Sequence, residues 1–161
     1  MYSTRVSRHI KATRPAVYRA LLDAAAIAQW RVPDGMTSEV HEFEPREGGR
    51  FRVSLTYDAP VGTGKSAPQT DTYHGHFATL VPDEKVIEVL QFETADPALG
   101  GTMTMTTTLT EAPGGGTDVL IVHEGIPDVV PAADNKSGTR MALAHLARLV
   151  EADEDPGTAT G

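Results

Sequence analysis

Apolar residues recur at every second position through much of this chain, which is the spacing of strands with one buried face. The segment 102–110 shows it most clearly, because Met103, Met105 and Leu109 share one face and five threonines share the other. We predict strands over 2–11, 37–43, 49–57, 73–81, 85–92, 102–110 and 117–124. In 85–92 both faces carry apolar residues, so the pattern leaves open which face points inward.

Three helices are predicted from caps and from helical spacing. Thr13 can cap a first helix in which Ala16, Val17, Ala20 and Leu21 fall on one face. Asp23 can cap a short second helix that ends near Trp30, before the break at 33–35. A long third helix begins near Asp134. Its expected apolar stripe is Ala142, Leu146, Leu149 and Val150, with Leu143 at the margin.

The order of these elements predicts an α+β fold. One strand, two helices, six strands and a closing helix favour a twisted antiparallel sheet whose consecutive strands pair, with the long helix across its concave face. We expect a single domain over 1–153 and a disordered tail over 154–161. The Gly- and Pro-rich loop 58–71 is either a lid or an ordinary surface loop.

Composition narrows the classes of function. The chain has 161 residues and a formal net charge of -8, which disfavours nucleic acid and anionic membrane surfaces as partners. It has no cysteine, so disulfides and thiolate chemistry are excluded. No signal-peptide pattern and no apolar run of about 20 residues is present, so we expect a cytoplasmic protein.

Short motifs do not establish catalysis or metal binding. The segment 62–66 ends like a phosphate-binding loop, but Ala59 stands where that motif needs glycine and Pro68 opposes the helix that should follow. His74 and His76 share a strand face, and a solvent-facing pair is favoured over a metal site. Glu42 and Glu44 are interpreted as solvated carboxylates. We therefore expect no catalytic residue, no metal and no cofactor.

Four segments together resemble a known family. They are 23–30, ending in Trp30; Arg46-Glu-Gly-Gly-Arg-Phe51; the strand containing Gly75, with Val81-Pro82 after it; and the helix 138–151. In this order and spacing they resemble the START-like (SRPBCC) superfamily, in its Hsp90-ATPase-activator-homologue (AHSA1-like) branch, over about residues 2–151. The resemblance implies a helix-grip fold built around a cavity.

Two positions depart from the family pattern. Many relatives have Gly-Trp where this chain has Gly138-Thr139, and Trp-Trp where it has Gln29-Trp30. The first change removes an aromatic ring from the seam between the last helix and the sheet. We expect it to enlarge or reshape the cavity.

The first hypothesis is binding of a small hydrophobic or amphipathic molecule between the sheet and the C-terminal helix. The expected cavity wall comprises Trp30, Phe51, Val53, Tyr57, Tyr73, Phe77, Met103, Met105 and Leu146. The alternatives are a cyclase- or hydrolase-type enzyme that uses His74, Glu88 or His123, and a ligand-free protein-interaction module, chaperone-associated or homodimeric. An inward polar pair at hydrogen-bond distance favours the enzyme, and a cavity below about 100 Å³ favours the interaction module.

Overall fold

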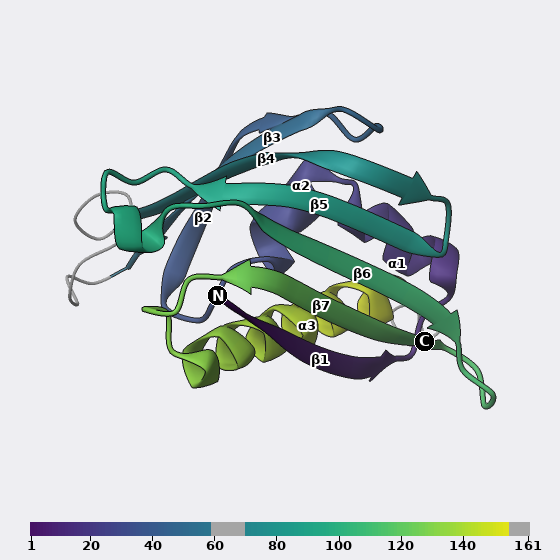
Figure 1. Cartoon of the computed structure of the whole chain (residues 1–161). Helices are drawn as coiled ribbons and strands as arrows, with labels where there is room; N and C mark the ends of the chain where they lie inside the picture. The colour runs from purple at the N-terminus through teal and green to yellow at the C-terminus, as the bar shows by residue number, and fades with distance from the viewer. Residues whose placement is uncertain (59–69, 155–161) are drawn as a thin grey trace.

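The computed structural model describes residues 1–58 and 70–154 (Figure 1). In chain order the elements are β1 (Tyr2–Ile10), α1 (Arg14–Leu21), α2 (Ala24–Trp30), β2 (Met36–Phe43), β3 (Arg50–Tyr57), β4 (Thr70–Val81), β5 (Lys85–Phe92), the 3₁₀ turn η1 (Pro97–Leu99), β6 (Met103–Glu111), β7 (Thr117–Ile126) and α3 (Ala132–Glu154). The motif at 62–66, most of the loop 58–71 and the tail from 155 onward lie outside the described residues.

The strands form one seven-stranded antiparallel sheet in the order β1-β7-β6-β5-β4-β3-β2. From β2 to β7 each strand pairs with the next along the chain, and β1 joins the free edge of β7. All three helices lie on one face of the curved sheet, with α3 running along β1 (Figure 1). The predicted α+β, helix-grip-like arrangement is therefore confirmed.

Local capping chemistry fixes where the short helices begin. The Thr13 hydroxyl accepts from the Ala16 amide, and the Asp23 carboxylate accepts from the Ala26 amide at 3.1 Å. Each bond satisfies one of the amides that the first turn of a helix leaves without a partner. Trp30 then ties α2 to α1, because its indole Nε1 donates to the Ala20 carbonyl at 2.9 Å.

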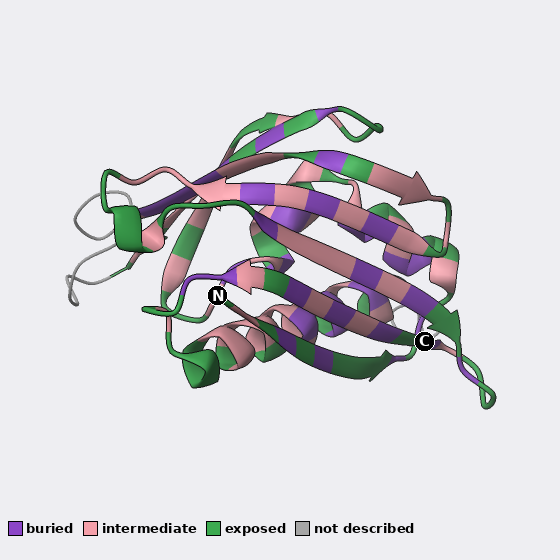
Figure 2. Ribbon diagram, viewed as in Figure 1, coloured by how far each residue is buried: buried purple, intermediate pink, exposed green. Residues whose placement is uncertain are grey.

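The core lies between the sheet and the helices, and includes α1, α2 and the C-terminal half of α3 (Figure 2). Leu143, Leu146, Ala147 and Val150 are the fully buried residues of that helix. The expectation that Leu143 lies at the margin is wrong. It is only 1% exposed, because its side chain faces the sheet, whereas Leu149 is only partly buried.

The structure also shows which face of β5 points toward the interior. Val86, Glu88 and Leu90 are buried, and the residues between them are only partly covered. A carboxylate therefore faces the same interior as two aliphatic side chains, which the sequence pattern left open.

Gly75 in β4 is required by the close approach of β5. A Cβ at this position would lie 2.0 Å from the Val89 carbonyl oxygen, whereas a Cβ on Gly138 in α3 would meet no atom within 4 Å. Backbone atoms of a central sheet pair cannot move aside without breaking the ladder.

We therefore predict that Gly75→Ala lowers the free energy of unfolding by about 2–3 kcal/mol. The matched change Gly138→Ala should raise it by about 0.5–1 kcal/mol, because alanine loses less backbone entropy in a helix. Urea denaturation of both variants measures the two effects. A Gly75→Ala variant as stable as the wild type would contradict the close approach.

Candidate functional site: a cavity between the sheet and the last helix

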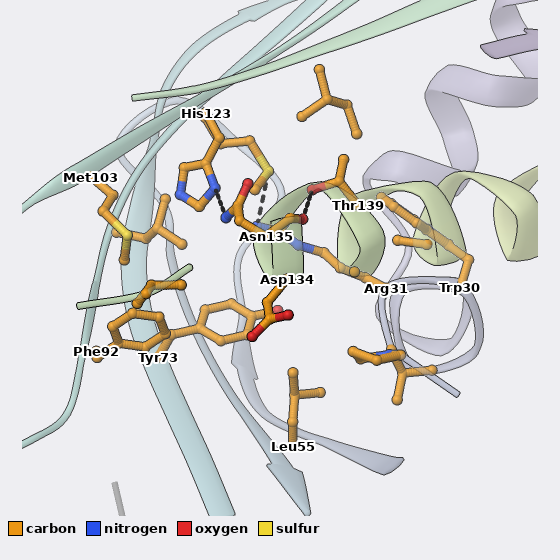
Figure 3. A pocket seen from close by; sticks show the side chains of 18 residues that line it. Trp30, Arg31, Leu55, Tyr73, Phe92, Met103, His123, Asp134, Asn135 and Thr139 are labelled. Atoms are coloured by element: carbon orange, nitrogen blue, oxygen red, sulfur yellow. Dashed lines mark hydrogen bonds between the residues drawn. The ribbon is translucent and has the colours of Figure 1, made fainter. Parts of the chain in front are cut away.

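A cavity of about 240 Å³ lies between the concave face of the sheet, the end of α2 and the first half of α3 (Figure 3). A second, outer cavity of about 650 Å³ shares seven lining residues with it, so the two lie side by side. Those shared residues are Pro33, Leu55, Tyr73, Phe92, Val130, Asp134 and Gly138. Most of the inner wall is apolar and includes Trp30, Leu90, Met103, Met105 and Ile121.

The cavity stays open because α3 presents short side chains to it. Asn135, Gly138, Thr139 and Ala142 all line the inner cavity and are spaced i, i+3, i+4 and i+7, so they share one helix face. Further along the helix, larger side chains fill the space against the sheet, as described above. Gly138-Thr139, which stands where the family pattern has Gly-Trp, thus lies in the cavity wall.

The nine predicted wall residues are divided between cavity and core. Trp30, Tyr73, Met103 and Met105 line the inner cavity, and Tyr57 lines the outer one. The other four, Phe51, Val53, Phe77 and Leu146, lie in the packed core and line neither cavity. The rings of Phe51 and Phe77 lie 5.2 Å apart between centroids, so they pack against each other instead of facing open space.

An ion pair in the cavity wall involves a residue that sequence reasoning missed. Arg31, directly after α2, places Nη1 2.5 Å from Oε1 of Glu88 in β5. The two side chains are only 14% and 6% exposed. The guanidinium also donates to the Met105 sulfur at 3.4 Å and lies 5.3 Å from the centre of the Tyr73 ring. Glu88 was a sequence candidate, but nothing in the local pattern marked Arg31.

This pair neutralises its own charge inside a largely apolar wall. Burial lowers the pKa of Arg31, but the Glu88 carboxylate, helped by Tyr73, raises that pKa by more, so the net shift is upward. Two charges removed from water are tolerable only when each offsets the other and further contacts satisfy the remaining donors. The cavity therefore contains a fixed dipole and no net charge from these two residues.

His123 in β7 is held by a polar chain of three side chains. The Thr4 hydroxyl donates to the Asn135 Oδ1 at 2.6 Å, which turns the Asn135 Nδ2 toward His123 Nδ1 at 3.2 Å (Figure 3). An amide nitrogen can only donate, so Nδ1 must be the acceptor and the ring proton must sit on Nε2. Burial, with a smaller contribution from the Arg31 charge, lowers the pKa of His123 to about 4. The ring is thus neutral at physiological pH.

Two polar atoms on wall residues have no hydrogen-bond partner within residues 1–58 and 70–154. They are the His123 Nε2 and the Tyr73 hydroxyl oxygen, both fully buried. Burial raises the pKa of the Tyr73 hydroxyl, an effect that Arg31 opposes, so the hydroxyl stays protonated. Each group therefore has a hydrogen without an acceptor, on a residue that lines the inner cavity.

Other candidates lie away from this site. His74 bonds to Glu93 and Gln91 on the sheet's other face, and His76 is exposed. Across residues 1–58 and 70–154, no three His, Cys, Asp or Glu side chains are grouped as metal ligands would be. None of the helices in this part of the chain has the length and apolar character needed to cross a membrane.

A family model described as "Activator of Hsp90 ATPase homolog 1-like protein" matches residues 11–151. The chain belongs to this family. As an AHSA1-like protein it is also placed in the START-like superfamily that its segments resemble. A search of curated proteins finds no match.

Solved structures agree with this assignment. A crystal structure of a Chromobacterium violaceum protein is 32% identical, covers 94% of this chain and 99% of its own, and superposes with a TM-score of 0.81. An AHSA1 protein from Silicibacter pomeroyi is 15% identical, with the same coverages and a TM-score of 0.75. A Rhodobacter sphaeroides protein is 22% identical over 94% of this chain and 93% of its own, with a TM-score of 0.77. The last two likenesses show the fold alone.

The ion pair of this AHSA1-like protein gives a stability prediction. Glu88→Leu leaves the buried Arg31 charge without a partner and should lower the free energy of unfolding by about 3–5 kcal/mol. The double variant Arg31→Met/Glu88→Leu removes both charges and should be more stable than Glu88→Leu alone. Chemical denaturation of the single and double variants measures the coupling.

The solvent-exposed pair between Arg52 and Glu93 is the matched control, and Arg52→Met should change stability little. If the costs of the two single changes at the buried pair simply add, the coupling between Arg31 and Glu88 is absent.

His123 gives a pH prediction. Its pKa is about 4 in the folded protein and near 6.5 when unfolded, so between these values the unfolded chain binds a proton that the folded protein excludes. The contribution of His123 to the free energy of unfolding is fully present above pH 6.5. It falls by about 3 kcal/mol as the pH drops to 4.

His123→Asn keeps an acceptor near the Nδ1 position and removes the titration, so its loss of stability over this range should be smaller. Thermal melts from pH 7.5 to 4 measure the difference. The control His76→Asn, on an exposed residue, should follow the wild-type profile, and an identical profile for His123→Asn would refute the assignment.

Proposed function

We propose that this AHSA1-like protein binds a small hydrophobic or amphipathic molecule in the cavity between the sheet and α3. The supporting observation is an apolar space of about 240 Å³ that opens beside a larger outer cavity. Its wall combines rigid aromatic rings with the adaptable Met103 and Met105 side chains, a mixture that suits apolar ligands. Burial of apolar surface would supply most of the affinity, at roughly 25 cal/mol per Å² before ordering costs.

The alternatives receive less support. The inward pair of Arg31 and Glu88 meets the distance expected of an acid/base pair, but each group is engaged by the other's charge. His123 has its Nδ1 engaged by Asn135, and its pKa of about 4 makes it a weak base. A ligand-free interaction module would be expected to have a smaller cavity. We therefore favour binding over catalysis. We also propose that the protein is cytoplasmic, and a homodimer is the assembly to test.

The first experiment is native mass spectrometry of the purified protein, followed by denaturation and organic extraction. We expect a co-purified hydrophobic compound at a stoichiometry near one. The same preparation of Gly138→Phe should lose it, because the added ring would project from α3 at the boundary that both cavities share.

Gly138→Ala is the matched control, since a methyl group leaves most of the space free, and it should retain the compound. If the wild type is empty, and its Trp30 fluorescence and melting temperature do not respond to a panel of lipids and polyketides, hydrophobic binding is refuted.

A further inference from the structure

Two hydrogen-bond donors on residues that line the inner cavity lack an acceptor among the described residues, and these donors carry information about the ligand. The His123 Nε2–H and the Tyr73 hydroxyl both belong to residues that line the cavity, and neither has a partner in the part of the chain that the structure describes. A buried donor left without an acceptor destabilises the folded protein, because it has lost its hydrogen bond to water and gained none in return. A protein tolerates such an unpaired donor most readily when a bound ligand supplies the missing acceptor.

The proton position on His123 is set by the protein and does not depend on a ligand. In the structure the Asn135 amide accepts from Thr4 through Oδ1 and donates to His123 Nδ1 through Nδ2, so Nε2 carries the hydrogen. Nε2 is on the side of the ring turned away from Asn135 (Figure 3). The ring therefore offers a donor, and not an acceptor, to a molecule in the cavity.

The charge of the wall argues against an anionic ligand. Arg31 is the one cationic residue among those that line the inner cavity, and its Nη1 already lies 2.5 Å from the Glu88 carboxylate. Its Nη2 donates to the Met105 sulfur. Asp134 adds a carboxylate to the wall of both cavities. An anion would meet the Asp134 carboxylate and a cation whose charge Glu88 already balances.

We propose that the ligand is a neutral, largely apolar carbonyl compound whose oxygen atoms accept from the Tyr73 hydroxyl and the His123 Nε2–H. This inference rests on the proposed function and specifies its ligand class. The Tyr73 ring is held beneath the Arg31 guanidinium, and the His123 ring is held by Asn135, so both donors are positioned before a ligand arrives. Trp30, Phe92 and the two methionines would cover the apolar part of the molecule.

The test uses three probes of nearly equal shape, which are 2-acetylnaphthalene, 2-ethylnaphthalene and 2-naphthoate. Isothermal titration calorimetry of the full chain measures their dissociation constants. We expect the ketone to bind about tenfold more tightly than the hydrocarbon, despite its weaker hydrophobicity, and more tightly than the carboxylate. This comparison requires no variant, so it does not depend on any mutant folding.

Variants then assign the preference to the two donors. Tyr73→Phe removes the hydroxyl and keeps the ring, and His123→Asn keeps an acceptor for Asn135 but removes the Nε2–H. Each should weaken binding of the ketone by several-fold more than binding of the hydrocarbon, so that the preference for the ketone falls. Tyr57→Phe, which removes a hydroxyl from the outer cavity only, should keep the full preference.

Three outcomes would overturn the inference. They are equal binding of ketone and hydrocarbon, tightest binding of the carboxylate, and a ketone preference that survives in both donor variants. In each of these the hydrocarbon can still bind, which leaves the proposed function standing. Failure of all three probes to bind, together with an empty purified protein, would overturn the proposed function as well.

Discussion

The interior of this protein is organised around the buried ion pair between Arg31 and Glu88. It connects the residue after α2 to the middle of β5, across a sequence separation of 57 residues. Breaking such a pair exposes an uncompensated charge to a low-dielectric interior, so the position of α2 relative to the sheet is strongly constrained. Tyr73 and Met105 pack against the same guanidinium, and its charge helps to keep His123 neutral. The contacts of Tyr73 and Met105 with Arg31 thus depend on where this ion pair holds the guanidinium.

The long helix divides the space above the sheet into two parts. Its C-terminal half carries Leu143, Leu146 and Val150, which are buried against the sheet and provide much of the core. Its N-terminal half presents Asn135, Gly138 and Thr139 at helical spacing, and these short side chains leave the cavity open. The N-terminal turns of α3 therefore line the cavity, and its C-terminal turns stabilise the core. The family resemblance had pointed to this seam, because Gly138-Thr139 replaces the Gly-Trp of many relatives.

Membership of the AHSA1-like family establishes the fold and leaves the ligand open, because one fold can host many functions. The relevant evidence is therefore the chemistry of the wall. Among the described residues, apolar rings and thioethers dominate the wall, the single cation is paired, and two donors lack acceptors. This combination distinguishes the site from a purely apolar pocket, which would offer a ligand no fixed orientation, and from an anion site, which would present an unpaired cation.

The sequence by itself determined the elements, because their causes are local. Period-two alternation gave the strands, the Thr13 and Asp23 caps gave the helix starts, and antiparallel pairing of consecutive strands followed from short connections. Of the candidate wall, Tyr73, Met103 and Met105 were proposed from the inner-face periodicity of the strands, and Trp30 from its place at the end of the second helix. Periodicity cannot separate a core residue from a wall residue on the same face, which is why Phe51, Val53, Phe77 and Leu146 were grouped with them.

Only the tertiary structure decided which face of β5 points inward and that its Glu88 carboxylate pairs with Arg31. Both faces of that strand carry apolar residues, so the inward direction of Glu88 depends on its pairing with β4 and β6. Arg31, Asn135 and Thr4 have no distinguishing local pattern. They matter because the fold brings Arg31 against β5 and lets Asn135 of α3 bond to both β1 and β7. Side-chain contacts between distant segments depend on the packed geometry of all of them, and no single stretch of sequence encodes that geometry.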